Sequence, residues 1–199
     1  MSAIDILAKL DGLDTSSLDP LQRVLLVTDG TLTEILEATF LERIQLIKVA
    51  QQVIHANASH AQLDPGPDPD HKETVIERKV LLRGEASGRN YAYAESLIAV
   101  DRLGPTFRDE LLESNTPLGR LWLQYKLETF KELQAVRCQS ANHLSCYFEC
   151  AAASSLLVRT YRVFSGSRPA MIITEHFPTK YSPSVSTVIP VSGPEGRAR

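Results

Sequence analysis

Two charged side chains in this sequence fall on the apolar side of segments that otherwise alternate as β-strands. In "TVIERKVLL", Arg78 shares its parity with apolar residues on both sides, because side chains two apart in a strand point to the same face. In "MIITEHF", Glu175 stands in the same way between Ile173 and Phe177. An inward charge needs a partner, since an unpaired buried ion costs several kcal/mol.

Three interpretations of Arg78 and Glu175 are open on this pattern alone. The two side chains pair with each other as a buried salt bridge, or the register is misjudged and both face solvent. In the third interpretation both line a closed pocket and bind a polar ligand. A cation and a carboxylate in one pocket would suit a ligand with an anionic end and a hydroxyl end.

The other residues with useful chemistry form no recognisable site. The five histidines have no metal-ligand spacing to one another or to the three cysteines, so we predict no metal. His176 follows Glu175 directly, but alternation points it to the opposite face, where we expect a surface or supporting histidine. The patterns of a phosphate loop and of a serine nucleophile are absent.

Two predicted hairpins position Arg78 and Glu175. The first joins "TVIERKVLLRG" to "RNYAYAESLIAV", and the second joins "SLLVRTYRVF" to "RPAMIITEHFP" through a turn at "SGSRP". Two further strands are predicted in "ERIQLIKVAQQVIH" and "ETFKELQAVRCQ". No repeat of solenoid length is visible. Because the strands cluster as hairpins, we predict a single α+β domain with a mainly antiparallel sheet.

Helices are predicted before and between the strands. Asp19 followed by Pro20 is a start signal, and Thr31 or Thr33 begins "TLTEILEATF", which has helical spacing. Helices are also expected in "GPTFRDELLES", after "NTPLG", and in "ANHLSCYFECAAAS". The segment 55–72 contains three prolines and three aspartates, so it is expected to be either a mobile lid or plain disorder.

The composition argues against several classes of protein. The chain has 199 residues and a formal net charge of −3, which favours one domain and disfavours a broad nucleic-acid surface. No apolar run approaches the ~20 residues needed to span a bilayer, and the N-terminus lacks the pattern of a signal peptide. Three cysteines without a Cys-x-x-Cys spacing are typical of a cytoplasmic protein. The oligomeric state is left open.

Five short segments carry a family likeness: "LVTDGTLTEILE", "IERKVLL", "YAESLI", "NTPLGRLW" and "ITEHFP" occur in this order. Together they resemble the chorismate lyases (chorismate pyruvate-lyases), most closely the cyanobacterial and actinobacterial branch, over residues 19–178. Residues 1–18 are then an N-terminal helical lead and 179–199 a C-terminal tail. The resemblance implies an α+β fold with helical flaps over a buried pocket. It also implies a cofactor-free and metal-free conversion of chorismate to 4-hydroxybenzoate and pyruvate.

The resemblance also implies roles for particular residues. The pocket arginine that holds the ring carboxylate falls on Arg78, and the pocket glutamate that meets the 4-hydroxyl falls on Glu175. Whether Glu175 is a general base or only binds the substrate of a pericyclic reaction stays open. Two backbone amides that touch the ligand carboxylate correspond to Leu32 and Leu118. Where better-known bacterial enzymes carry a second arginine, this chain has Glu95. Candidates for a substitute cation are Arg83, Arg89, Arg102 and Arg120.

Two other functions compete with this one. The same fold class serves as the sensor of transcription regulators, so a non-catalytic domain that binds an aromatic acid is one alternative. Such regulators carry a DNA-binding domain ahead of the sensor, and only 18 residues precede the first matched helix here. A lyase that makes a different hydroxybenzoate is the other alternative.

Overall fold

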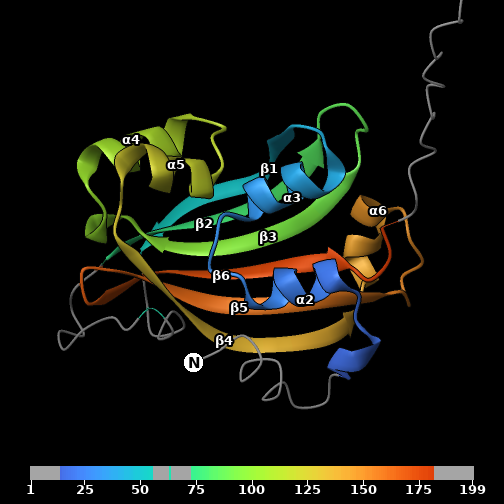
Figure 1. The fold of residues 1–199 in the computed structure, drawn as a ribbon. Coiled ribbons are helices and arrows are strands. Elements are labelled where there is room, and N and C mark those ends of the chain that lie inside the picture. Colours follow the sequence, from blue (N-terminus) through green and yellow to red (C-terminus); the bar gives the residue numbers. More distant parts are fainter. Residues whose placement is uncertain (1–13, 56–62, 64–72, 182–199) are drawn as a thin grey trace, which may run out of the picture.

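The computed structural model describes residues 14–55, 63 and 73–181, and its centre is a six-stranded antiparallel sheet (Figure 1). The strands are β1 (Ile44–His55), β2 (Thr74–Gly84), β3 (Asn90–Ala99), β4 (Thr129–Ser140), β5 (Ser155–Ser165) and β6 (Arg168–Pro178). Their order across the sheet is β1-β2-β3-β6-β5-β4. Both predicted hairpins are confirmed, since β2 pairs with β3 and β5 pairs with β6. Most of the predicted 55–72 loop lies outside the described residues.

The helices lie where the sequence predicts them. They are α2 (Pro20–Val27), α3 (Leu32–Phe40), α4 (Pro105–Glu113), α5 (Leu118–Tyr125) and α6 (Ser145–Phe148), with short 3₁₀ turns η1 (Thr15–Ser17), η3 (Val100–Arg102) and η4 (Asn142–Leu144). The Asp19 side chain caps α2 by accepting from the backbone N–H of Gln22, and the side-chain oxygen of Gln22 accepts from the backbone N–H of Asp19, which makes a capping box. Within the described part of the chain, no helix is long and apolar enough to cross a membrane.

The two halves of the chain repeat one arrangement, in which two helices precede three strands joined in sequence. The first half is α2-α3-β1-β2-β3 and the second is α4-α5-β4-β5-β6. Because β3 pairs antiparallel with β6, the halves are related by an approximate twofold axis at the centre of the sheet. The register keeps this relation in detail: β1 has an irregularity after Lys48, opposite Val80, and β4 has one after Leu133, opposite Tyr161.

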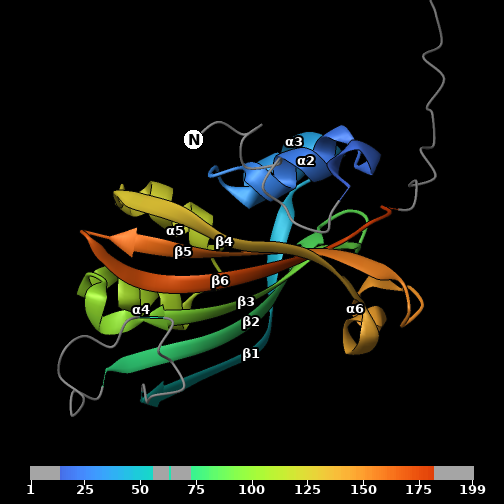
Figure 2. The same cartoon turned by 90° about the horizontal axis from the view of Figure 1, so that it is seen from below.

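The four longer helices cover one face of the sheet as two pairs (Figures 1 and 2). The pair α2 and α3 packs on one end, around Leu82, Leu157 and Phe177. The pair α4 and α5 packs on the other end, around Ile98 and Met171. The two pairs touch where α3 meets α5, and the sheet beneath that junction carries the two charged residues singled out in the sequence.

The parity argument is confirmed for both charged residues, which lie on the helix-covered face. Arg78 is 1% exposed and Glu175 is 4% exposed, so the solvent-facing interpretation is wrong. His176 lies on the opposite face, as alternation predicts. It is nevertheless buried, at 5% exposure, and the expected surface position is wrong. The cause is a second layer: α6 and η4 cover this face with a cluster that includes Leu144 and Tyr93, the cross-strand neighbour of His176.

Candidate functional site

A pocket lies between the sheet and the junction of α3 with α5. Its empty volume, counted to its open mouth, is about 570 Å³. All six strands contribute to the floor, and the first residues of α3 and α5 form the opposite wall. The four residues assigned from the sequence all line this pocket: Arg78, Glu175, Leu32 and Leu118.

Arg78 is a buried cation to which no described residue of the protein is hydrogen-bonded. None of the three guanidinium nitrogens has a hydrogen-bond partner within the described part of the chain. Burial lowers the pKa of Arg78 to about 10, so the side chain stays charged at neutral pH. Burial and the charge of Arg78 together also lower the pKa of Lys48. A buried guanidinium of this kind is unfavourable unless an anion enters the pocket to bind it.

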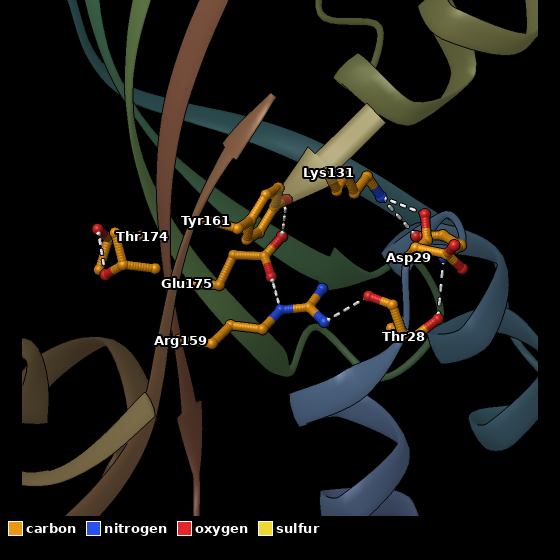
Figure 3. A network of polar contacts seen from close by, with 9 residues as sticks. Thr28, Asp29, Lys131, Arg159, Tyr161, Thr174 and Glu175 are labelled. Atoms are coloured by element: carbon orange, nitrogen blue, oxygen red, sulfur yellow. Dashed lines mark hydrogen bonds and ion pairs between the residues drawn. The ribbon is translucent and has the colours of Figure 1, made fainter. Parts of the chain in front are cut away.

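Glu175 does not pair with Arg78, so the salt-bridge interpretation is wrong. Its carboxylate instead accepts a hydrogen bond from Arg159 Nε at 2.5 Å and one from the Tyr161 hydroxyl at 2.9 Å (Figure 3). Arg159 Nη1 also donates to the carbonyl oxygen of Thr28 at 3.0 Å. Burial opposes the charge of Arg159, but the Glu175 carboxylate outweighs it and raises the pKa of Arg159. The two hydrogen bonds thereby hold the carboxylate in a fixed orientation.

The approximate twofold axis relates the two buried arginines to each other. On β2, Val80 lies opposite the irregularity of β1, and Arg78 precedes it by two residues. On β5, Tyr161 lies opposite the irregularity of β4, and Arg159 likewise precedes it by two residues. The cross-strand neighbour of Arg78 is Ser96, whereas that of Arg159 is Glu175. One arginine of the pair therefore has an internal carboxylate, while its equivalent faces a serine and is left available for an external anion.

The opposite wall of the pocket consists of two helix N-termini. The N-cap residues, Thr31 for α3 and Pro117 for α5, make no side-chain hydrogen bond to the helix ends. The first N–H groups of each helix, including those of Leu32 and Leu118, have no partner within their own helix, and the helix dipole adds positive potential there. Gly119 allows the two ends to meet, because a Cβ at this position would lie 2.4 Å from Thr31 Cγ2.

Lys131 is a further cation in the pocket, and no pattern in the sequence predicts it there. Its ammonium donates to the carbonyl oxygens of Asp29, at 2.5 Å, and Gly30, at 3.0 Å (Figure 3). It also lies 5.1 Å from the centroid of the Trp122 ring and 5.6 Å from that of Tyr161. Burial lowers the pKa of Lys131 to about 8. The lysine is therefore mostly protonated at neutral pH and close to its titration range.

The substitute cations suggested by the sequence lie elsewhere. Glu95 points to the outer face of the sheet, where it pairs with Lys79 at 3.4 Å. None of the four suggested arginines is among the described residues that line the pocket: Arg83, Arg89, Arg102 and Arg120. Arg102, for example, is paired with Glu73 through two short contacts of 2.5 and 2.6 Å.

Comparison with known proteins gives a consistent result. Residues 26–183 match the family model described as chorismate pyruvate-lyase Rv2949c-like. The chain is 31% identical over 164 residues to a chorismate pyruvate-lyase of Mycobacterium tuberculosis, with 78% of each chain covered. It is 29% identical over 165 residues to that of Mycobacterium leprae, with 78% of this chain and 72% of the relative covered.

A solved structure confirms the predicted fold class. The effector domain of PhnF from Mycobacterium smegmatis superposes with a TM-score of 0.58 at 14% sequence identity. The superposition covers 77% of this chain and 91% of that domain. At this identity the likeness concerns the fold alone, a single α+β domain around an antiparallel sheet.

Proposed function

Since the chain belongs to the chorismate pyruvate-lyase Rv2949c-like family, as the five sequence segments predict, we propose that it converts chorismate into 4-hydroxybenzoate and pyruvate. The observation that carries the proposal is the buried guanidinium of Arg78, which has no hydrogen-bond partner in the described part of the chain and lines the pocket. Chorismate is a small cyclohexadiene with two carboxylates, so it offers the anion that this cation requires.

In the proposed complex Arg78 holds the ring carboxylate. The planar guanidinium has all its donors unused, and a carboxylate accepts two of them in a bidentate arrangement. The uncapped N–H groups of Leu32 and Leu118 are the proposed donors to the same carboxylate, because both lie at helix N-termini that face the pocket. Together they fix the ring above the central strands of the sheet.

The proposed reaction removes the enolpyruvyl group and makes the ring aromatic. The ether bond between ring carbon C3 and the enolpyruvyl oxygen breaks, and ring carbon C4 loses its proton. The leaving enolpyruvate gains a proton at its methylene carbon and becomes pyruvate, so protons and electrons balance without an external oxidant. Formation of the aromatic ring supplies the driving force, and the protein mainly has to orient the substrate and manage one proton.

Glu175 is the group that we propose for that proton. Its carboxylate lines the pocket and is oriented by hydrogen bonds from Arg159 and Tyr161. We assign it to orient the 4-hydroxyl group and to accept the proton from C4. In a pericyclic route the C4 hydrogen would pass directly to the enolpyruvyl methylene, and Glu175 would only orient the hydroxyl.

Turnover of chorismate is the direct test of the proposed function. Purified protein mixed with chorismate should release 4-hydroxybenzoate and pyruvate in equal amounts, separated and identified by chromatography. Release of 3-hydroxybenzoate would reject the proposal in favour of a different lyase. Binding of 4-hydroxybenzoate without any turnover of chorismate would reject it in favour of a non-catalytic domain that binds aromatic acids.

The relation between the two halves gives a second test, at Ser96. Ser96→Glu places a carboxylate opposite Arg78 just as Glu175 stands opposite Arg159, so Arg78 should gain an internal partner and lose its ligand. We expect kcat/KM for chorismate to fall by at least about a hundredfold while the melting temperature is kept or raised. Ser96→Gln is the matched control, because it adds the same bulk without the charge. Equal losses in the two variants would contradict the charge argument.

A further inference from the structure

We infer that Lys131 binds the second carboxylate of the substrate, on its enolpyruvyl group, and thereby selects a dianion over a monoanion. The inference rests on the proposed function and adds a residue to it. The resemblance to known lyases assigned no residue to this carboxylate. Glu95 stands where better-known enzymes carry a second arginine, and none of the arginines suggested as substitutes is among the described residues that line the pocket.

The charges of the pocket match a ligand with two negative charges. Among the described residues that line it, three are charged: Arg78, Lys131 and Glu175. The charge of Glu175 is already compensated by Arg159, which lies 2.5 Å away. Within the described residues, the direct partners of the Lys131 ammonium are carbonyl oxygens and Arg78 has no partner, so a dianion would supply a direct counter-ion to each cation.

Lys131 also has the donor capacity for this role. An ammonium group has three N–H donors, and the carbonyl oxygens of Asp29 and Gly30 occupy two of them. The third is free for a ligand atom. The rings of Trp122 and Tyr161 lie beside the ammonium and narrow the space around it, which favours a flat anionic group such as a conjugated carboxylate.

The two cations reach the pocket on the same face of the sheet, but from strands near its two opposite edges. Arg78 comes from β2 and Lys131 from β4, so four inter-strand steps separate their backbones, roughly 19 Å along the sheet. Both have long side chains, and both line the same pocket. A ligand between them must present one carboxylate at each end, as chorismate does with its ring and enolpyruvyl groups.

This arrangement distinguishes the substrate from the product. When pyruvate leaves, it takes the second carboxylate with it, and 4-hydroxybenzoate keeps only the carboxylate assigned to Arg78. Lys131 should therefore contribute to the binding of chorismate and contribute little to the binding of 4-hydroxybenzoate. A lysine with a purely structural role would affect both ligands alike.

Substitution of Lys131 tests the inference at pH 7. Lys131→Met should lower kcat/KM for chorismate by about 10- to 100-fold, the effect of losing one charge-assisted hydrogen bond. Its dissociation constant for 4-hydroxybenzoate should stay within about threefold of the wild-type value. Lys131→Arg keeps the positive charge and should recover most of kcat/KM. The melting temperatures of both variants show whether the fold is retained.

The pH profile of kcat/KM provides a second readout. The groups that face Lys131 are Arg159 and Tyr161 from β5, Glu175 from β6, Trp122 from α5, and Asp29. Burial and Glu175 raise the pKa of Tyr161 well above 10, and Arg159 also keeps its charge, so neither titrates between pH 7 and 9. Binding through the ammonium is complete below a pKa of about 8 and is lost as pH rises above it. Wild-type kcat/KM should fall by about tenfold between pH 8 and pH 9 and then level off near the value for Lys131→Met, and Lys131→Arg should abolish that fall.

The outcomes separate this inference from the proposed function. If the wild-type protein turns over chorismate but Lys131→Met has an unchanged kcat/KM, the inference fails and the proposed function stands. An equal loss of chorismate and 4-hydroxybenzoate binding would also overturn it, because it would indicate a structural lysine. If the wild-type protein releases no pyruvate from chorismate, the proposed function itself fails.

Discussion

Arg78→Met should lower kcat/KM for chorismate by about a hundred- to a thousandfold and at the same time make the protein more stable. The loss of activity follows from removing a buried, charge-assisted partner of the ring carboxylate, which costs about 3–4 kcal/mol. Most of the effect should be on KM, because Arg78 holds a group that does not itself react. Steady-state kinetics with chorismate measure it.

The gain in stability follows from the absence of a partner in the ligand-free protein. The Arg78 guanidinium is 1% exposed and makes no hydrogen bond within the described residues. Methionine fills a similar space without the charge, so the free energy of unfolding should rise by about 1–4 kcal/mol. For a chain of this length the melting temperature should rise by about 2–4 °C for each kcal/mol.

A matched control is available in the same protein. The side chain of Arg102 is also buried, but it is paired with Glu73, and both side chains are about 5% exposed or less. Arg102→Met leaves that carboxylate buried without its partner, so it should destabilise the fold by about 3–5 kcal/mol. If Arg78→Met destabilises the protein to the same extent, Arg78 is a structural residue and its assignment to the ligand is wrong.

Glu175→Gln should reduce both activity and stability. As the proposed general base, Glu175 should contribute about 10²- to 10⁴-fold to kcat. The substitution also removes the counter-charge of Arg159, which is 2% exposed, at a cost of about 3–5 kcal/mol in the free energy of unfolding. Turnover rates and chemical denaturation measure the two effects independently.

A double variant separates the two roles of Glu175. Glu175→Gln combined with Arg159→Met removes both charges of the pair, so it should regain most of the lost stability. It should not regain turnover, because no carboxylate is then present to accept the C4 proton. Recovery of turnover in the double variant, or near-wild-type turnover of Glu175→Gln, would reject the base and favour the pericyclic route. Tyr161→Phe keeps the carboxylate and should reduce kcat much less.

The sequence predicted the inward direction of Arg78 and Glu175 but not their partners. Direction depends on strand alternation, which is a local property of each segment. The partner of Glu175 depends on which strand lies next to β6 and in what register, and this is set by the whole sheet. On β5 the alternation also does not show which arginine points inward, because each face of "SLLVRTYRVF" carries one arginine among apolar residues.

Lys131 could not be found from its own segment. In "ETFKELQ" the aromatic residue Phe130 suggests the inner face, but the structure leaves Phe130 67% exposed and turns Lys131 inward. The reversal has a tertiary cause: carbonyl oxygens of the segment between α2 and α3 and the ring of Trp122 provide a place for the ammonium. These groups are distant in the sequence, so no local pattern reports them.

The strand order has one further consequence. Among the strands that the structure describes, only the ladder between β3 and β6 joins the two halves of the sheet, and the pocket lies over that ladder. Arg78 and Leu32 come from the first half, whereas Lys131, Glu175 and Leu118 come from the second. A ligand held by both sets would act as a noncovalent cross-link, and its binding free energy would add to the work of separating the halves. The pocket therefore resembles a ligand site at the interface of a dimer whose two subunits are joined in one chain.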